Sequence, residues 1–223
     1  PLWSRGLGDV YKRQALDKKL REDLQDELRH LHRRLGITIV YVTHDQEEAM
    51  RLSQRIAIFS HGRIVGLGTG YDLYQNPPNA FVASFLGNSN FLRAKVRGQA
   101  AVQFEQQGLA ITPTANLKNE QDVLLMLRPE KAQVLPLDVA AQTPLPAGWN
   151  EIAVQVTEVV FLGESLTCHV VTPGGCHLTL KAMGSGLQPL QPGAQAKVRW
   201  AASEAGLYDS WNESDLSKGA GAH

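Results

Sequence analysis

Residues 37–50 read ITIVYVTHDQEEAM, and the fold of the first part of the chain is predicted from this stretch. Residues 37–42 are mostly β-branched and do not alternate with polar residues, which is typical of a strand buried on both faces of a parallel sheet. Asp45 and Glu48 fit a capping box, in which Asp45 accepts from a helix N–H and Glu48 reaches back. His44 is therefore predicted at the carboxyl end of a parallel strand, the edge of an α/β sheet where ligands bind.

A leucine-rich segment precedes this stretch and predicts a long amphipathic helix. Its leucines recur at steps of three or four residues, which places them on one helix face: Leu16, Leu20, Leu24, Leu28, Leu31 and Leu35. Charged residues cover the other faces, and Gly36 follows where a C-cap glycine belongs.

A hairpin and two short helices are predicted after residue 50. Two apolar runs, 55–60 and 64–68, lie on either side of His61-Gly62-Arg63, which favours a tight turn that contains His61. The two short helices are expected at 71–74 and 79–86, separated by Pro77 and Pro78.

In this order, residues 15–90 resemble the downstream part of the nucleotide-binding subunits of ABC transporters. The strongest stretch is VTHDQEEA at 42–49, and RIAIFSHGRIVGLGTG at 55–70 agrees with it. The nearest group is the importer ATPases for polyamines, iron, sulfate and sugars, with the spermidine/putrescine type closest. The resemblance implies an α/β fold, the C-terminal part of a P-loop NTPase (RecA-like) parallel sheet. Gly70 departs from the family, which usually has proline there.

The resemblance also implies roles for two residues. Asp17, in Ala15-Leu16-Asp17, would belong to the D-loop and face the partner subunit in a nucleotide-sandwich dimer, although an N-cap role is equally compatible with it. His44 would be the switch histidine, a catalytic and cofactor-binding residue that senses the γ-phosphate and helps organise the attacking water. Phosphoryl transfer depends on such positioned groups more than on covalent chemistry. No metal ligand is predicted.

The phosphate-binding motifs of these ATPases are absent from the sequence. No G-x-x-x-x-G-K-[ST] string occurs in the 223 residues, nor does an LSGGQ-type signature or an acidic strand for Mg²⁺. In the family these motifs precede Ala15-Leu16-Asp17. The chain is therefore expected to be a truncated subunit without ATPase activity of its own, while its parent would use ATP and Mg²⁺.

The sequence changes character after residue 90, and residues 91–209 predict an antiparallel β domain. Short apolar runs alternate with Gly and Pro turns. The runs are 91–96, 101–104, 109–112, 123–127, 152–161, 166–171, 176–181 and 196–200. MLRPE at 126–130 and the later VTEVVFLGESLTCHV resemble the TOBE domain, an OB-like regulatory barrel that follows the ATPase domain in these importers. Residues 210–223 are expected to be a flexible tail.

Two groups of side chains in this β domain allow more than one interpretation. Arg128 and Glu130 are interpreted mainly as a structural pair, with contact to a small anion as the alternative. The aromatic residues are interpreted as core or edge packing and not as base-stacking platforms: Phe161, Trp200 and Trp211.

Two cysteine-histidine pairs, 168–169 and 176–177, suggest a metal site. A two-residue turn at Pro173-Gly174 would place Val171 opposite Cys176. Cys168 and Cys176 would then point to opposite faces, which would exclude a disulfide and a Cys₂His₂ zinc site. A loop longer by one residue would change this parity.

Composition narrows the function classes. The chain has 22 basic and 22 acidic residues, which argues against a general nucleic-acid binder. It shows no secretory signal and no apolar run near 18 residues. Residues 1–14 end in GDVYKRQ, which resembles a translated sequencing adapter, so they are expected to be a non-native leader without regular structure. A genuine flexible arm is the alternative.

Together these observations predict an ATP-binding subunit of an ABC importer for polyamine-like solutes. Its partners would be a second copy of the subunit, transmembrane permease subunits and, indirectly, a periplasmic solute-binding protein, at the cytoplasmic face of a bacterial inner membrane. The alternative is a stand-alone OB-like module for small-anion sensing or protein contact. A nucleic-acid-binding OB domain is the least favoured.

Overall fold

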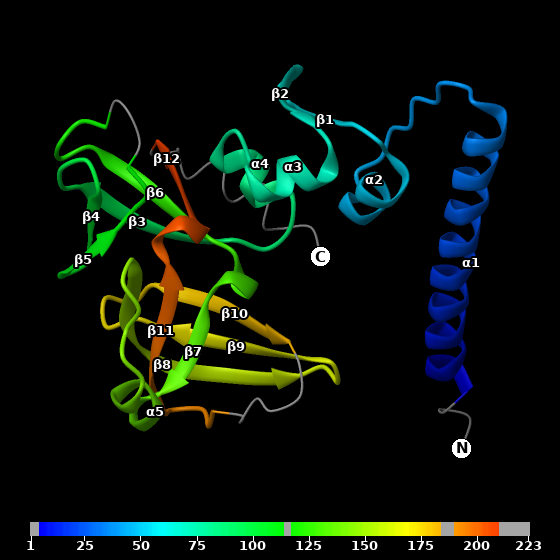
Figure 1. The fold of residues 1–223 in the computed structure, drawn as a ribbon. Helices are drawn as coiled ribbons and strands as arrows, with labels where there is room; N and C mark the ends of the chain where they lie inside the picture. Colours follow the sequence, from blue (N-terminus) through cyan, green and yellow to red (C-terminus); the bar gives the residue numbers. More distant parts are fainter. Residues whose placement is uncertain (1–4, 114–116, 184–189, 210–223) are drawn as a thin grey trace. The chain divides into compact units, whose positions relative to one another are not determined.

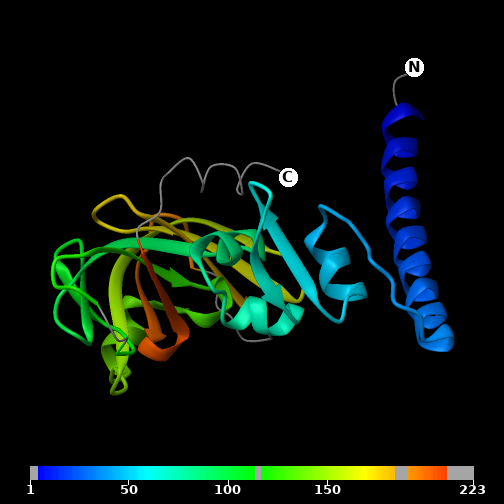
Figure 2. The same cartoon turned by 90° about the horizontal axis from the view of Figure 1, so that it is seen from above.

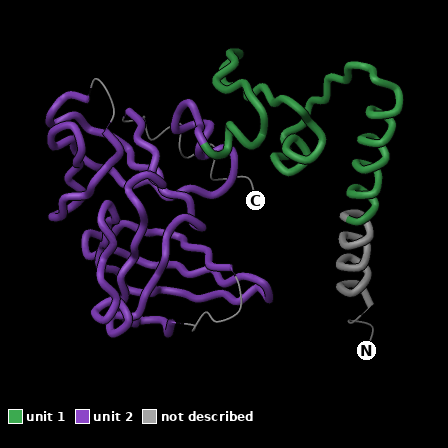
Figure 3. The backbone as a smooth tube through the Cα atoms, in the orientation of Figure 1, with its two compact units in different colours: residues 1–75 green, residues 76–223 purple. Residues whose placement is uncertain are grey.

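The chain divides into two compact units, residues 1–75 and residues 76–223 (Figure 3). The computed structural model describes residues 5–113, 117–183 and 190–209, with side chains from Lys19 onward. The predicted boundary at residues 90 and 91 lies 15 residues beyond this division, because α4 (Ala80–Phe85) belongs with the β strands that follow it. The predicted tail at 210–223 lies outside the described residues.

Unit 1 contains three helices and a hairpin (Figure 1). Its elements are α1 (Arg5–Leu35), α2 (Gln46–Leu52), β1 (Ile56–Ser60), β2 (Arg63–Gly68) and α3 (Gly70–Gln75). The helix α1 begins at Arg5, so the expectation of no regular structure in the first fourteen residues is wrong. A long helix that is already nucleated extends at low cost, and each glycine within it costs only about 1 kcal/mol relative to alanine.

The predicted parallel strand at 37–42 is not formed. This segment has no regular secondary structure, and Val40 and Val42 are 87% and 90% exposed. A strand needs hydrogen-bonded neighbours, and the other described strands of unit 1, β1 and β2, pair with each other. The apolar sequence is therefore present without the neighbouring strands that would bury it, and no P-loop NTPase sheet is seen in the described part of the chain.

The predicted hairpin is confirmed (Figure 2). The strands β1 and β2 are antiparallel, with Ser60 opposite Arg63, and only His61 and Gly62 lie between them. Both turn residues have positive φ, 49° and 74°, which is the conformation that a two-residue hairpin turn requires. His61 is thus a turn residue.

The described residues of unit 2 form two five-stranded antiparallel sheets. One has the order β12-β6-β3-β4-β5 and the other β10-β9-β8-β11-β7. The bounds of the first sheet are Ala205–Asp209 (β12), Asp122–Leu127 (β6), Asn90–Val96 (β3), Ala101–Phe104 (β4) and Gln107–Ala110 (β5). The bounds of the second are His177–Met183 (β10), Ser165–Val171 (β9), Trp149–Phe161 (β8), Gln195–Ala201 (β11) and Gln133–Pro136 (β7). Each of the eight predicted runs overlaps a strand, although the run at 109–112 does so only at residues 109 and 110, and β7 and β12 were not predicted.

The two sheets exchange their last strands. The strand β6 is followed by a 3₁₀ turn, Pro129–Lys131, and then by β7, which pairs with β11 of the other sheet. The strand β11 is followed by a 3₁₀ turn, Ala202–Glu204, and then by β12, which pairs with β6. Lys131 and Glu204 join the two turns through an ion pair of 2.7 Å. Each sheet is therefore completed by a strand from the other half of the sequence.

Two asparagine side chains link the sheets further. Asn90 on β3 accepts from the Thr179 N–H and donates to the Thr179 carbonyl, both at 2.8 Å. Asn150 on β8 makes the equivalent pair of bonds with Ala110 on β5, at 2.7 and 2.9 Å. Both side chains satisfy the backbone groups of an edge strand as a further strand would. One hydrophobic core is shared by the two sheets, and fully buried Trp200 is its largest side chain.

Candidate functional site

His44 lies in a bend between the irregular segment 37–43 and α2, and it is exposed. Asp45 is the N-cap of α2, and its Oδ1 accepts from the N–H groups of Glu47 and Glu48 at 2.8 and 3.2 Å. This half of the predicted capping box is confirmed. In the described part of the chain, no hydrogen bond or ion pair involves the His44 ring, so both ring nitrogens are available to a ligand.

Glu48 completes the cap through an intermediate hydroxyl. Thr43 Oγ1 accepts from the Asp45 N–H at 2.9 Å and donates to Glu48 Oε2 at 2.8 Å. The expected direct bond from Glu48 to the N-cap N–H is replaced by this two-step relay. The residues immediately before and after His44 are thereby tied to the same carboxylate.

Two further donors reach the Glu48 carboxylate. The Tyr41 hydroxyl donates to Oε2 at 3.1 Å, and Gln25 Nε2, from α1, donates to Oε1 at 3.4 Å. The hydrogen bond to Glu48 raises the pKa of Tyr41 above its ordinary value, because ionisation of the phenol would break it. One turn further along α2, Arg51 pairs with Asp26 of α1 at 3.2 Å.

Sequence reasoning found only part of this network. The spacing of Asp45 and Glu48 predicted the cap, whereas Gln25, Tyr41 and Thr43 were missed. Gln25 is 23 residues from Glu48, so no local pattern signals the contact. A threonine two residues before the N-cap was the one local signal, since its hydroxyl can bond to a backbone N–H two residues on.

The other predicted site residue, Asp17, falls within the backbone range of α1, but its side chain lies outside the described residues. Its D-loop role is untested. The helix α1 also carries the predicted leucine face. The described leucines of this face are exposed, from 43% at Leu28 to 59% at Leu20.

Arg128 has a structural role in unit 2. Its side chain is 3% exposed, and its Nη1 donates to the carbonyls of Ala83 and Leu86 at 3.0 and 2.8 Å and to Ser89 Oγ at 2.7 Å. These carbonyls belong to the C-terminal end of α4, where four backbone acceptors lack helical partners. The structural interpretation of Arg128 therefore agrees with its contacts.

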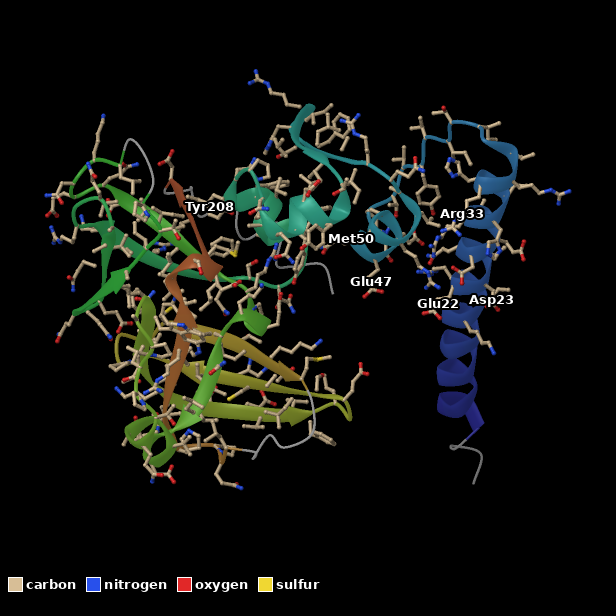
Figure 4. The ribbon with its side chains drawn as sticks, viewed as in Figure 1. Glu22, Asp23, Arg33, Glu47, Met50 and Tyr208 are labelled. Atoms are coloured by element: carbon tan, nitrogen blue, oxygen red, sulfur yellow. The ribbon has the colours of Figure 1, made fainter. Side chains whose placement is uncertain are left out.

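Tyr208 lies on β12 (Figure 4) and bonds to the segment before α4. Its hydroxyl donates to the Pro77 carbonyl at 3.0 Å. Burial raises the pKa of Tyr208 to about 12. Arg128 and Tyr208 together explain why the boundary between the units falls before Asn76.

The register of β9 and β10 differs from the predicted one by one residue. Val171 lies opposite His177 and not Cys176, because the loop Pro173–Gly175 has three residues and ends with Gly175 at φ 85°. By this register Cys168 and Cys176 point to the same face of the sheet, whereas the two-residue turn had placed them on opposite faces. Both thiols are free, and burial raises the pKa of Cys168 to about 11. In the described ranges, no group of three or more His, Cys, Asp or Glu side chains could hold a metal ion.

The aromatic interpretation is correct for one residue and wrong for another. Trp200 is fully buried in the core, whereas Phe161 at the end of β8 is 72% exposed. Trp211 lies outside the described residues.

Where the structure is described, no helix combines the length and the apolar character that a membrane crossing needs.

Comparison with known proteins adds the decisive observation. Residues 125–206 match the TOBE domain family. The chain is 44% identical over 128 residues to a spermidine/putrescine import ATP-binding protein of Bacteroides fragilis, a match that covers 57% of this chain and 28% of that protein. The chain is thus similar to import ATP-binding proteins, and residues 125–206 are similar to the TOBE domain.

Other relatives extend the match. A spermidine/putrescine import ATP-binding protein of Rubrobacter xylanophilus is 37% identical over 84% of this chain and 49% of its own length. A sulfate/thiosulfate import ATP-binding protein of Chromobacterium violaceum is 34% identical over 87% of this chain and 52% of its own length. The chain thus spans about half or less of these relatives. A solved structure of the molybdate-binding protein ModG, 17% identical, covers 54% of this chain with a TM-score of 0.47.

Proposed function

We propose that this chain is part of an ATP-binding subunit that energises solute uptake by an ABC importer. The observation that carries the proposal is the similarity of up to 44% to spermidine/putrescine import ATP-binding proteins, together with the TOBE match at 125–206. Polyamine-like cations are the proposed solute class. Sulfate-like anions are the alternative class, because a sulfate/thiosulfate import relative is 34% identical.

Within this proposal His44 contacts the terminal phosphate of bound ATP. Its exposed ring has no hydrogen-bond partner in the described part of the chain, and the bonds of Thr43 and Asp45 fix the backbone on either side of it. An imidazole held in this way can share a proton with a phosphate oxygen or with water. Asp17 is proposed to face the second copy of the subunit at the nucleotide.

The described residues do not by themselves fit ATP and Mg²⁺. No phosphate-binding glycine loop occurs in the sequence, and no cluster of metal ligands is found in the described part of the chain. His44 and Asp17 would supply two contacts to a nucleotide that other residues hold. No catalytic step is therefore derived from this chain alone.

The proposed partners follow from the same relationship. They are a second copy of the subunit, membrane permease subunits and, indirectly, a periplasmic solute-binding protein. The proposed location is the cytoplasmic face of a bacterial inner membrane. A stand-alone anion sensor is less favoured, because Arg128 is buried and its Nη1 donates to carbonyls at the end of α4 and to Ser89.

Phosphate release from ATP tests the proposal in two steps. The purified 223-residue chain is expected to release no phosphate above a blank without protein. A full-length subunit that contains this sequence is expected to hydrolyse ATP, and His44→Ala is expected to lower its kcat by at least about 100-fold, as for loss of a group that stabilises transition-state charge. Full activity in that variant would reject the role of His44. Hydrolysis by the 223-residue chain would reject the proposal that residues outside it hold the nucleotide.

A further inference from the structure

Glu48 is the residue on which the contacts around His44 converge. We propose that Glu48 is a positioning residue for His44, whose carboxylate fixes the backbone on both sides of the histidine while the ring stays free. This inference rests on the proposed function only for its consequence in ATP hydrolysis. The positioning itself is a property of the chain as it stands.

The first support is the relay through Thr43. A capping box would need only Asp45 and a direct bond from the third helical residue. Here Asp45 alone accepts the N–H groups of Glu47 and Glu48, so the first turn of α2 is capped without the Glu48 side chain. The Glu48 carboxylate instead reaches Thr43, which precedes His44 and holds the N–H of the residue that follows it. The bond between the Thr43 hydroxyl and the Asp45 N–H therefore spans the histidine, and Glu48 holds that hydroxyl.

The second support is that the carboxylate is itself held from other elements. It accepts from Tyr41 Oη and from Gln25 Nε2, and the raised pKa of Tyr41 reflects the first of these bonds. Gln25 is only 8% exposed, and a hydrogen bond made by a buried amide is stronger than one made in water. Arg51 and Asp26 add an ion pair between α2 and α1 one turn away. The group that positions His44 is thus anchored to α1.

The chemistry of the acceptor explains the choice of glutamate. A carboxylate offers about four acceptor sites and no donor, and here it meets three donors. Glutamine keeps one oxygen that can serve Thr43, whereas alanine leaves all three donors without this acceptor. Glu47, the preceding residue, is exposed and contributes its backbone N–H, so its side chain provides a control of equal charge on the same helix.

Amide hydrogen exchange in the ¹⁵N-labelled chain tests the positioning without any nucleotide. Glu48→Ala is expected to speed exchange of the Asp45 N–H about fivefold, the effect of losing a capping bond of typical strength. Thr43→Val should match it, Glu48→Gln should stay within about twofold of the parent, and Glu47→Ala should leave the rate unchanged. Amide resonances of the β domain that are the same in each variant and in the parent chain would confirm that the variants fold. Equal rates in Glu48→Ala and Glu47→Ala would overturn the inference.

A second measurement connects the positioning to activity. In a full-length subunit with this sequence, Glu48→Ala is expected to lower kcat for ATP roughly tenfold with KM within about twofold, because a displaced group loses transition-state contact more than substrate binding. Glu48→Gln should recover most of the rate. An unchanged kcat would overturn the proposed consequence. If exchange changes as expected but His44→Ala is fully active, the proposed function fails and the positioning stands.

Discussion

Arg128 shows how a buried charge can hold a chain segment in place. Its guanidinium is 3% exposed and is shared between carbonyls of α4 and Ser89. Arg199 does the same for α5 (Leu137–Gln142), donating to the carbonyls of Thr143 and Ala140 at 2.9 and 2.8 Å. Arg199 also pairs with Glu151, and although burial would raise the pKa of Glu151, the bonds from Arg199 and Lys197 lower it. A short helix is therefore fixed in each case by a buried arginine, Arg128 directly after β6 and Arg199 within β11.

Replacement of Arg128 is expected to destabilise unit 2 strongly. Arg128→Ala leaves the α4 carbonyls without their donor in a buried place, which should cost about 2–4 kcal/mol. Urea unfolding followed by near-ultraviolet circular dichroism measures this loss. Arg63→Ala, at an exposed position of the hairpin in unit 1, is the control and should change the free energy of unfolding by less than about 0.5 kcal/mol. Similar values for both variants would contradict the expected role of Arg128.

Ionisation of Tyr208 is expected to lower the stability of unit 2 at alkaline pH. The pKa of its phenol is about 12 in the folded chain, against an unfolded value of about 10. The folded state therefore keeps the proton longer, and its stability is fully present below about pH 10 and falls as the pH rises toward 12. Urea unfolding at pH 9, 10 and 11 should show this fall. Tyr208→Phe should remove that part of the slope and cost about 1 kcal/mol at pH 7, through the lost bond to Pro77. An equal slope in the variant would assign the fall to other groups.

At the scale of single elements, the strands of the β domain were predictable and the strand at 37–42 was not. Short apolar runs between turns are a local signal, and β4 matches its prediction at both ends. The run at 37–42 carries the same signal, but it pairs with no described strand, and the structure leaves it exposed. The Cys168 register failed for a related reason, since one additional loop residue reverses every side chain of β10 relative to β9.

Asn150 is expected to stabilise the edge strand β5. Asn150→Ala removes two hydrogen bonds to Ala110 from a side chain that is 4% exposed, which should cost about 2 kcal/mol. Exchange of the Ala110 N–H should accelerate in the same variant. Gln155→Ala on the same strand breaks a single exposed bond to Gly193 and should cost less than about 0.5 kcal/mol. Protection of Ala110 that survives in Asn150→Ala would refute the role of this side chain as a substitute strand.

At the scale of the whole molecule, the exchange of β7 and β12 was beyond sequence reasoning. Both strands are four or five residues long and pair with partners far along the chain, since β12 pairs with β6 about 80 residues earlier. No local pattern encodes such a pairing. The Asp45 cap beside His44 was predictable, because its motif is contiguous, whereas Gln25, which donates to Glu48, comes from another helix.

Removal of β12 is expected to unfold both sheets together. A chain that ends at residue 204 leaves the edge of β6 unpaired and opens the shared core, so unit 2 should lose its cooperative urea transition. A chain that ends at residue 209 keeps β12 and should unfold as the 223-residue chain does. A retained transition in the shorter chain would show that the first sheet is stable without the exchanged strand.

The strand exchange also sets an order of events during synthesis. The ribosome makes the strand β6 early, but its pairing partner β12 leaves the exit tunnel only after residue 209 is made. At roughly 5–20 residues per second, the edge of β6 remains uncovered for several seconds. Such an edge can pair with another nascent chain. The domain is therefore open to aggregation through β6 until its last strand has emerged.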